Sequence, residues 1–163
     1  PSTSCGICIT RSTGVVSGHR HPVRSSLAVS GAAPPDLVWE RYVDPARWPD
    51  WSPQIRAVDY PGPRLAAGTS GVVRGPCALA VPFEILSVDP QRRRWTWRVR
   101  PPVVGELILD HAVTPAAEGT RTTLDVQGPA AVVLAYLPVA RLALGRLVRP
   151  SAPPLRPSAP PHR

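Results

Sequence analysis

The chain has 163 residues, of which 43% are hydrophobic and 18% are charged. This length and composition predict one domain that buries its own core, and they exclude a wholly disordered polyelectrolyte. No run of 18 apolar residues occurs, so we expect no membrane span. The first 26 residues also lack the continuous apolar core of a secretory signal, so the cytoplasm is the expected location.

The net charge of +8 is distributed in a way that does not predict nucleic-acid binding. Residues 27–149 contain 14 of the 19 Arg and all 11 acidic residues, which leaves only +3 for this segment. A domain that binds phosphates usually concentrates its cations on the face that docks. Only residues 92–94 (Arg-Arg-Arg) form a cluster, and they lie in a predicted turn. We therefore expect no nucleic-acid partner.

The three cysteines do not form the pattern of a disulfide framework or of a metal site. Cys5 and Cys8 precede His19 and His21, but the two His lack the spacing of zinc-finger ligands. No base that would activate Cys77 as a nucleophile is identified beside it. No Gly-rich phosphate loop is present either. The sequence therefore predicts neither a metal nor a cofactor.

The two ends of the chain differ in composition from the segment between them. Residues 1–23 are rich in Ser, Thr and Gly without hydrophobic periodicity, which predicts a loose N-terminal extension. Residues 150–163 contain six Pro among fourteen positions, which favours an extended tail with a potential role in docking a partner. The folded domain is expected over residues 24–149.

The elements expected at the start of this domain are one strand and two short helices. Residues 24–30 alternate in polarity, which predicts the strand. Residues 34–36 (Pro-Pro-Asp) open a helix, because Pro is tolerated in a first turn and Asp complements the helix dipole. Residues 44–45 (Asp-Pro) begin a shorter helix, which Pro49 should end near Trp48.

Short segments of strand-like sequence then recur about every ten residues, separated by turns rich in Gly, Pro and Asp. The expected strands are 54–60, 68–75, 79–88, 92–100, 105–114 and 119–127. Residues 128–129 (Gly-Pro) start a long helix, in which Pro138 removes one backbone hydrogen bond and predicts a kink. One face of this helix carries an apolar stripe: Val133, Leu137, Ala140, Leu144 and Leu147.

This order of elements predicts an α+β fold. Six consecutive antiparallel strands must cover one apolar face, and a single long helix can do so by lying across it. A curved sheet that surrounds a helix leaves a gap between the two. That gap is the expected ligand site.

Several short motifs follow one another between residues 25 and 149: 33–40 (APPDLVWE), 44–53 (DPARWPDWSP), 82–90 (PFEILSVDP), 94–98 (RWTWR), 110–111 (DH) and 119–130 (GTRTTLDVQGPA). Their order and spacing resemble the polyketide cyclase/dehydrase branch of the START-like, or SRPBCC, superfamily. The resemblance implies a helix-grip fold, in which a curved antiparallel sheet of about seven strands surrounds the C-terminal helix. It also implies a deep, mostly apolar cavity for a hydrophobic small molecule.

Alternation along the strands predicts which side chains face this cavity. The resemblance adds one residue at the cavity mouth. The expected ligand-binding residues are Trp51 at the mouth, Phe83, Trp95, Trp97, Leu109, His111 and Leu124 on the strands, and Leu137 on the long helix. Two large rings on one concave face, those of Trp95 and Trp97, either line the gap or fill it, and the sequence leaves both outcomes open.

His111 is the ionisable residue that the last strands direct toward the cavity. A cyclase that forms carbon–carbon bonds needs a base for enolisation and a donor for the developing oxyanion. His111 would be the base and Tyr136, on the long helix, the donor. The alternative is a core histidine hydrogen-bonded to a backbone carbonyl or to water, which is the commoner role of a His on an apolar strand face.

Three functions follow from these observations. The leading hypothesis is a carrier or sensor of a hydrophobic small molecule, either aromatic or lipid-like. The second is a polyketide cyclase or dehydratase that uses His111 with Tyr136. The third is a protein-interaction domain with residues 150–163 as its docking segment. The oligomeric state is not predicted.

Overall fold

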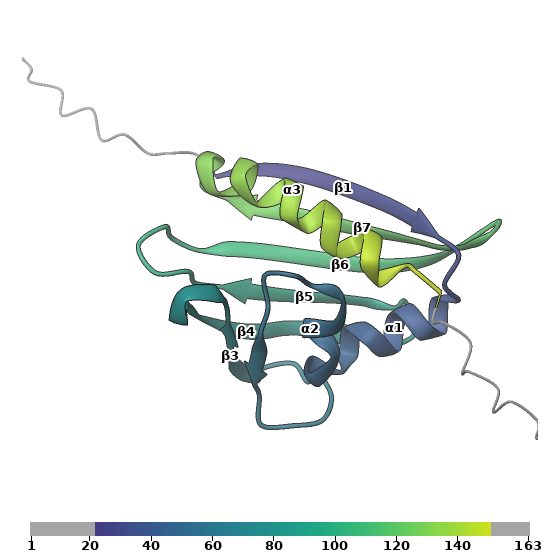
Figure 1. The fold of residues 1–163 in the computed structure, drawn as a ribbon, viewed down its shortest axis with the longest axis horizontal. Helices are drawn as coiled ribbons and strands as arrows, with labels where there is room; N and C mark the ends of the chain where they lie inside the picture. The colour runs from purple at the N-terminus through teal and green to yellow at the C-terminus, as the bar shows by residue number, and fades with distance from the viewer. Residues whose placement is uncertain (1–21, 151–163) are drawn as a thin grey trace, which may run out of the picture.

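A seven-stranded antiparallel sheet curves around a long C-terminal helix (Figure 1). The structure is a computed structural model, and it describes residues 22–150. The strands follow the order β1-β7-β6-β5-β4-β3-β2, so the first strand pairs with the last. The α+β architecture predicted from the sequence is confirmed. The predicted tails, residues 1–23 and 150–163, lie almost entirely outside the described residues, as do Cys5, Cys8, His19 and His21.

All the predicted strands are present, although their ends differ by a few residues from the expected ones. They are β1 (Val23–Gly31), β2 (Ala57–Asp59), β3 (Ser70–Arg74), β4 (Ala80–Asp89), β5 (Arg94–Val99), β6 (Leu107–Ala116) and β7 (Gly119–Gly128). The largest difference is at β2, which has three residues where seven were expected. Between Ile85 and Ser87 the β4–β5 register shifts, and such a bulge bends a strand and increases its twist.

The helical segments are α1 (Pro35–Val43), the 3-10 turn η1 (Pro45–Arg47), α2 (Trp48–Trp51), the 3-10 turn η2 (Pro76–Ala78) and α3 (Ala130–Leu147). The expectation that the second short helix ends near Trp48 is wrong. It continues as α2 to Trp51, and the amide of Ser52 donates to the Trp48 carbonyl over 2.9 Å. Pro49 is tolerated because it lies in the first turn, where no amide donor is needed.

Helix α3 lies across the inner face of the sheet, against β1 and β7 (Figure 1). Four members of the predicted apolar stripe are buried, and Leu137 is half-buried. By length and composition α3 is apolar enough to cross a membrane, a test that the core helix of a globular domain also passes. Because its stripe packs on the sheet, we assign α3 to the core.

The C-terminal end of α3 is held by the corner between β1 and α1. The amide of Ala33 donates to the Val148 carbonyl over 3.0 Å, and the Arg41 guanidinium donates to the carbonyls of Leu147 and Arg149. The start of β7 closes the same corner, where the Thr120 hydroxyl donates to the Ala33 carbonyl over 2.6 Å. One end of the helix is therefore fixed to the sheet by both backbone and side-chain bonds.

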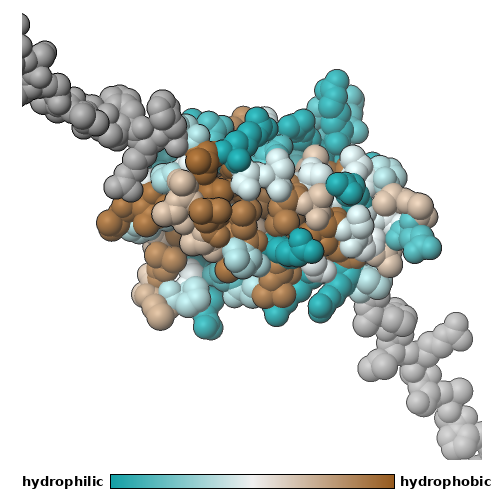
Figure 2. All heavy atoms as spheres, turned by 90° about the horizontal axis from the view of Figure 1, so that it is seen from above, coloured by the Kyte–Doolittle hydropathy of each residue, from teal (hydrophilic) through white to brown (hydrophobic). Residues whose placement is uncertain are grey.

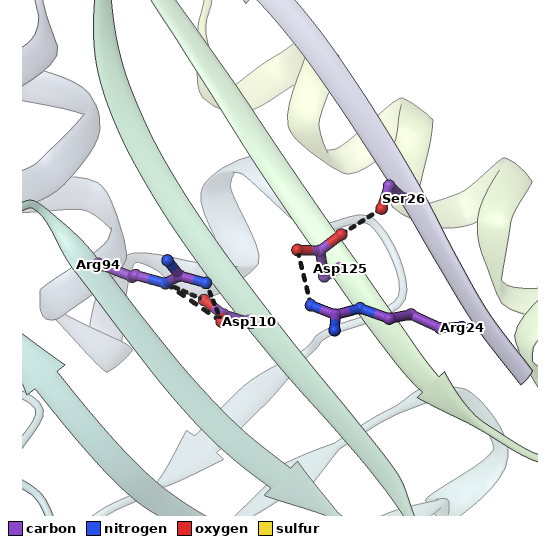
Figure 3. Close-up of polar contacts among 5 residues, drawn as sticks. All are labelled: Arg24, Ser26, Arg94, Asp110 and Asp125. Atoms are coloured by element: carbon purple, nitrogen blue, oxygen red, sulfur yellow. Dashed lines mark hydrogen bonds and ion pairs between the residues drawn. The ribbon is translucent and has the colours of Figure 1, made fainter. Parts of the chain in front are cut away.

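Ion pairs between strands cover the face of the sheet turned away from α3 (Figure 3). Arg94 on β5 donates hydrogen bonds to the carboxylate of Asp110 on β6 from both Nε and a terminal nitrogen. Asp125 on β7 accepts hydrogen bonds from Ser26 and Arg24 on β1, the latter over 3.2 Å. These pairs match side chains across neighbouring strands, so we assign this charged face to sheet stability.

Candidate functional site

Aromatic side chains fill one half of the space between the sheet and the helices. Trp95 on β5 is 1% exposed, and its ring stacks on His111 of β6 with 4.5 Å between centroids. Trp48 and Tyr42 each pack on Trp95 at 5.6 Å, and Phe83 packs on Trp48 at the same distance. This buried aromatic cluster leaves no room for a ligand in its half of the gap.

A chain of hydrogen bonds fixes the tautomer of His111 inside this cluster. The indole of Trp97 can only donate, and it donates to Nε2 of His111 over 3.2 Å. Nδ1 therefore carries the proton and donates to the Tyr42 hydroxyl over 3.3 Å. Tyr42 then donates to the Thr122 hydroxyl over 2.8 Å, and Thr122 donates to the Ala112 carbonyl. The polar hydrogens of Trp97, His111, Tyr42 and Thr122 therefore all have acceptors, whereas Nε1 of the neighbouring Trp95 is buried without one.

His111 is accordingly a neutral, fully partnered imidazole. It is 4% exposed, and burial lowers its pKa from 6.5 to about 3. It does not line the cavity described below. A general base needs a free nitrogen within reach of the proton that it removes. The geometry thus favours the core role of His111, and its catalytic role stays a prediction.

The other half of the gap is open and forms a cavity of about 220 Å³. Its walls come from β3 to β6, from the segment after α2, and from the N-terminal half of α3. Most of the lining is aliphatic, as at Val73, Val99 and Leu107. Among the residues that the structure describes, no charged side chain lines the cavity, and the phenol of Tyr136 is the only ionisable group on its wall. An apolar ligand fits most of this wall, because its aliphatic side chains have no hydrogen bonds to water that binding would break.

Two apolar side chains mark the place where the cavity reaches the surface. Leu79, just after η2, and Val104, in the β5–β6 loop, both line the cavity and are 45% and 43% exposed. Neighbouring Val103 is fully exposed. Further apolar surface gathers on the side that carries α3, where Leu134 and Leu142 are exposed (Figure 2). The cavity mouth therefore has an apolar rim.

The structure brings three of the predicted site residues to the cavity wall: Trp97, Leu109 and Tyr136. The others lie outside the wall: Trp51, Phe83, Trp95, His111 and Leu124 are buried in the core, and Leu137 is half-buried on α3. The two rings whose role the sequence left open behave differently. Trp95 fills the gap, whereas Trp97 lines it.

The expected ligand-binding residues omit several that line the cavity. Val81 and Val99 share the inner faces of β4 and β5 with Phe83 and Trp97, so alternation already directs them inward. Gln54 was expected to begin the strand 54–60, but it lies in the turn after α2, and no sequence pattern predicted its place on the cavity wall. Val132 is one turn from Tyr136 on α3, and helical spacing was a sufficient signal there.

Tyr136 presents a neutral hydroxyl. Burial raises the pKa of Tyr136 to about 12, so the phenol keeps its proton at any physiological pH. No hydrogen bond joins this hydroxyl to another residue within 22–150. The same part of the chain contains no group of three or more His, Cys, Asp or Glu that could hold a metal ion. The cavity can therefore offer hydrogen bonds and apolar contact.

Comparison with known proteins identifies relatives of this architecture. The sequence model of the family described as polyketide cyclase / dehydrase and lipid transport matches residues 22–152. No curated protein sequence matches the chain. Among solved structures, Ara h 8.0201 is 12% identical with a TM-score of 0.65, over 77% of this chain and 95% of that one. Major latex-like protein 151 of Panax ginseng is 14% identical with a TM-score of 0.63, over 78% and 98%.

A third solved structure is more similar in sequence. DynU16, a protein of the dynemicin biosynthetic locus, is 26% identical to this chain with a TM-score of 0.64. The match covers 77% of this chain and 45% of DynU16. The first two structures establish the shared helix-grip architecture, in which a curved sheet surrounds the C-terminal helix.

Proposed function

Because the chain belongs to the polyketide cyclase / dehydrase and lipid transport family, we propose that it binds a hydrophobic small molecule between the sheet and α3, as a carrier or sensor. One observation carries the proposal: half of the gap that the fold creates is left open as an apolar cavity. Most ligand sites are concave, mainly apolar and largely preformed, as this one is.

The size of the cavity restricts the ligand. An engineered apolar cavity of about 150 Å³ holds benzene, whereas drug-sized ligands occupy pockets of about 300–1,000 Å³. The cavity here, at about 220 Å³, lies between these limits. A compound of one or two rings fits it, and a sterol or a long acyl chain exceeds it.

The alternative function, a cyclase or dehydratase using His111 with Tyr136, draws its support from the family description and from the phenol on the cavity wall. The position of His111 weakens it, because both ring nitrogens are bonded to protein groups away from the cavity. A carrier or sensor needs no catalytic base, so we favour the binding function over the cyclase. The protein-interaction alternative rests on residues 150–163, most of which lie outside the described part of the chain.

Tryptophan fluorescence tests the binding proposal directly, because Trp97 is the tryptophan among the cavity residues. We expect saturable quenching of the full chain by a two-ring aromatic compound such as 2-methylnaphthalene. The quenching should persist in Trp51→Phe, whose side chain is as buried as that of Trp97 but lies outside the cavity, and it should largely disappear in Trp97→Phe. Calorimetry on the same variants measures binding independently of the fluorophore.

The outcomes of this titration separate the alternatives. No saturable response by either method removes the binding proposal. Quenching that persists unchanged in Trp97→Phe places the ligand elsewhere. A His111→Ala variant should keep its affinity under either function, so turnover of a poly-β-ketone substrate mimic decides between them. Turnover by the unsubstituted protein that His111→Ala loses supports the cyclase, and binding without turnover by the unsubstituted protein supports a carrier. The cytoplasmic location stays a prediction, which cell fractionation tests.

A further inference from the structure

Two polar side chains on the cavity wall lack hydrogen bonds to the described residues. Gln54 lies on the cavity wall, in the turn after α2. A hydrogen bond of 3.0 Å from the Ile55 amide to the Ser52 carbonyl closes this turn. Its Oε1 is buried without a hydrogen-bond partner. The hydroxyl of Tyr136, on α3, is the second such group. The third polar side chain of the wall, Trp97, already donates to His111.

An unpaired buried carbonyl oxygen is unusual, since the large majority of buried polar groups in folded proteins have a partner. The amide of Gln54 offers an acceptor and two donors at the end of a soft torsion, so it can turn either end to a ligand. The Tyr136 hydroxyl can donate and accept. A ligand hydroxyl, which also donates and accepts, has the hydrogen-bonding chemistry that both groups need.

The rest of the wall disfavours a charged group inside the cavity. No Arg or His of residues 22–150 lines it, and the Arg side chains that form ion pairs on β5 lie on the opposite face of the sheet. A carboxylate in this cavity would be a buried charge without a counter-ion, which costs far more than the apolar contacts of one or two rings return.

We propose that the ligand is a neutral compound of one or two rings whose hydroxyl group hydrogen-bonds to the Gln54 amide and the Tyr136 phenol. This inference rests on the proposed function and narrows its ligand class. It excludes fatty acids, aromatic carboxylates and purely hydrocarbon ligands as the preferred occupants.

Three probes that share the naphthalene ring system test the proposal: 2-naphthol, 2-methylnaphthalene and 2-naphthoate. Calorimetric titration of the full chain at neutral pH gives the dissociation constant of each. Gln54→Leu and Tyr136→Phe each remove one polar group while keeping a side chain of similar volume. Gln91→Leu, an exposed change in the β4–β5 turn, is the matched control.

We expect each cavity variant to weaken 2-naphthol binding about 3- to 10-fold, the usual range for one neutral hydrogen bond. Binding of 2-methylnaphthalene should stay constant or become tighter, and Gln91→Leu should change neither. In the unsubstituted protein, 2-naphthoate should bind at least about 10-fold more weakly than 2-naphthol. Thermal unfolding of every variant confirms that it is folded before its affinity is compared.

Failure of this inference is distinguishable from failure of the proposed function. If no probe binds the unsubstituted protein, the binding function itself is wrong. If the probes bind but neither cavity variant changes the preference for 2-naphthol over 2-methylnaphthalene, the cavity binds small molecules and the hydroxyl inference is wrong. Equal affinity for 2-naphthoate and 2-naphthol overturns the requirement for a neutral ligand.

Discussion

His111 makes the stability of the protein dependent on pH. Its pKa is about 3 in the folded chain, against 6.5 for an exposed imidazole, because burial disfavours the charged ring. Between these values only the unfolded chain binds the proton, so protonation favours unfolding. The contribution of this neutral histidine is complete above about pH 6.5 and is lost progressively as the pH falls toward 3.

Urea unfolding at several pH values measures this effect. Each pH unit below 6.5 should cost about 1.4 kcal/mol, so the protein should lose about 2 kcal/mol between pH 6.5 and pH 5. His111→Gln keeps a hydrogen-bond donor and an acceptor but cannot titrate. Between pH 6.5 and pH 5, the free energy of unfolding of this variant should fall only by the smaller amount that other titrating groups cause. Equal losses in both proteins would show that His111 already titrates normally in the folded state.

Alternation along a strand predicts which face of the sheet a residue occupies, but not which residues it contacts. It correctly placed Trp95, Trp97 and His111 on one inner face of the sheet. It could not assign their partners, because the bond from Trp97 to His111 depends on ring orientation in three dimensions. The place of Gln54 on the cavity wall was not predicted for a related reason. The strand expected over 54–60 begins only at Ala57, and the proximity of Gln54 to the cavity arises from tertiary packing.

Helix α3 owes its position to one apolar face, and this element allows a matched pair of substitutions. Leu144 is 1% exposed, whereas Leu142, two residues earlier on the same helix, is 48% exposed. Leu144→Ala should lower the free energy of unfolding by about 2–5 kcal/mol, since it leaves a void in a close-packed core. Leu142→Ala should change it by no more than about 0.5 kcal/mol. Equilibrium urea unfolding measures both, and similar losses would contradict this orientation of α3.

The sequence predicted the elements well where a pattern lasted for ten residues, as in β4, β6, β7 and α3. The predicted bounds of short elements were less accurate. We took Pro49 as a helix stop, but its place in the first turn of α2 makes it compatible with the helix. Only the position of a Pro relative to the helix start distinguishes the two roles, and a four-residue helix provides too little pattern to locate that start.

The molecule as a whole divides its interior into a filled and an open half, and the sequence could not foresee this division. It predicted a gap between sheet and helix and a set of large rings on the inner face. Whether a ring fills or lines the gap depends on what lies opposite it. Trp95 faces Tyr42 and Trp48 from the α1–α2 segment, whereas Trp97 borders the part covered by Val132 and Tyr136.

The two ends of α3 should differ in their exchange of amide hydrogens with solvent. The C-terminal half is tied to Ala33 and Arg41, but the half before Pro138 covers the cavity and has fewer buried side chains. Pro138 also lacks the amide that would bond to the Leu134 carbonyl, so the two halves are weakly coupled there. Hydrogen exchange followed by mass spectrometry should show faster exchange in residues 130–137 than in 139–147.

Bound 2-naphthol should slow the exchange of residues 130–137 and leave residues 139–147 unchanged, whereas uniform rates along α3 would contradict this division. The half of α3 before Pro138 forms a wall of the cavity, whereas the half after it is bonded to the corner between β1 and α1. We therefore expect a ligand to enter and leave through local opening of residues 130–137, without unfolding of the domain.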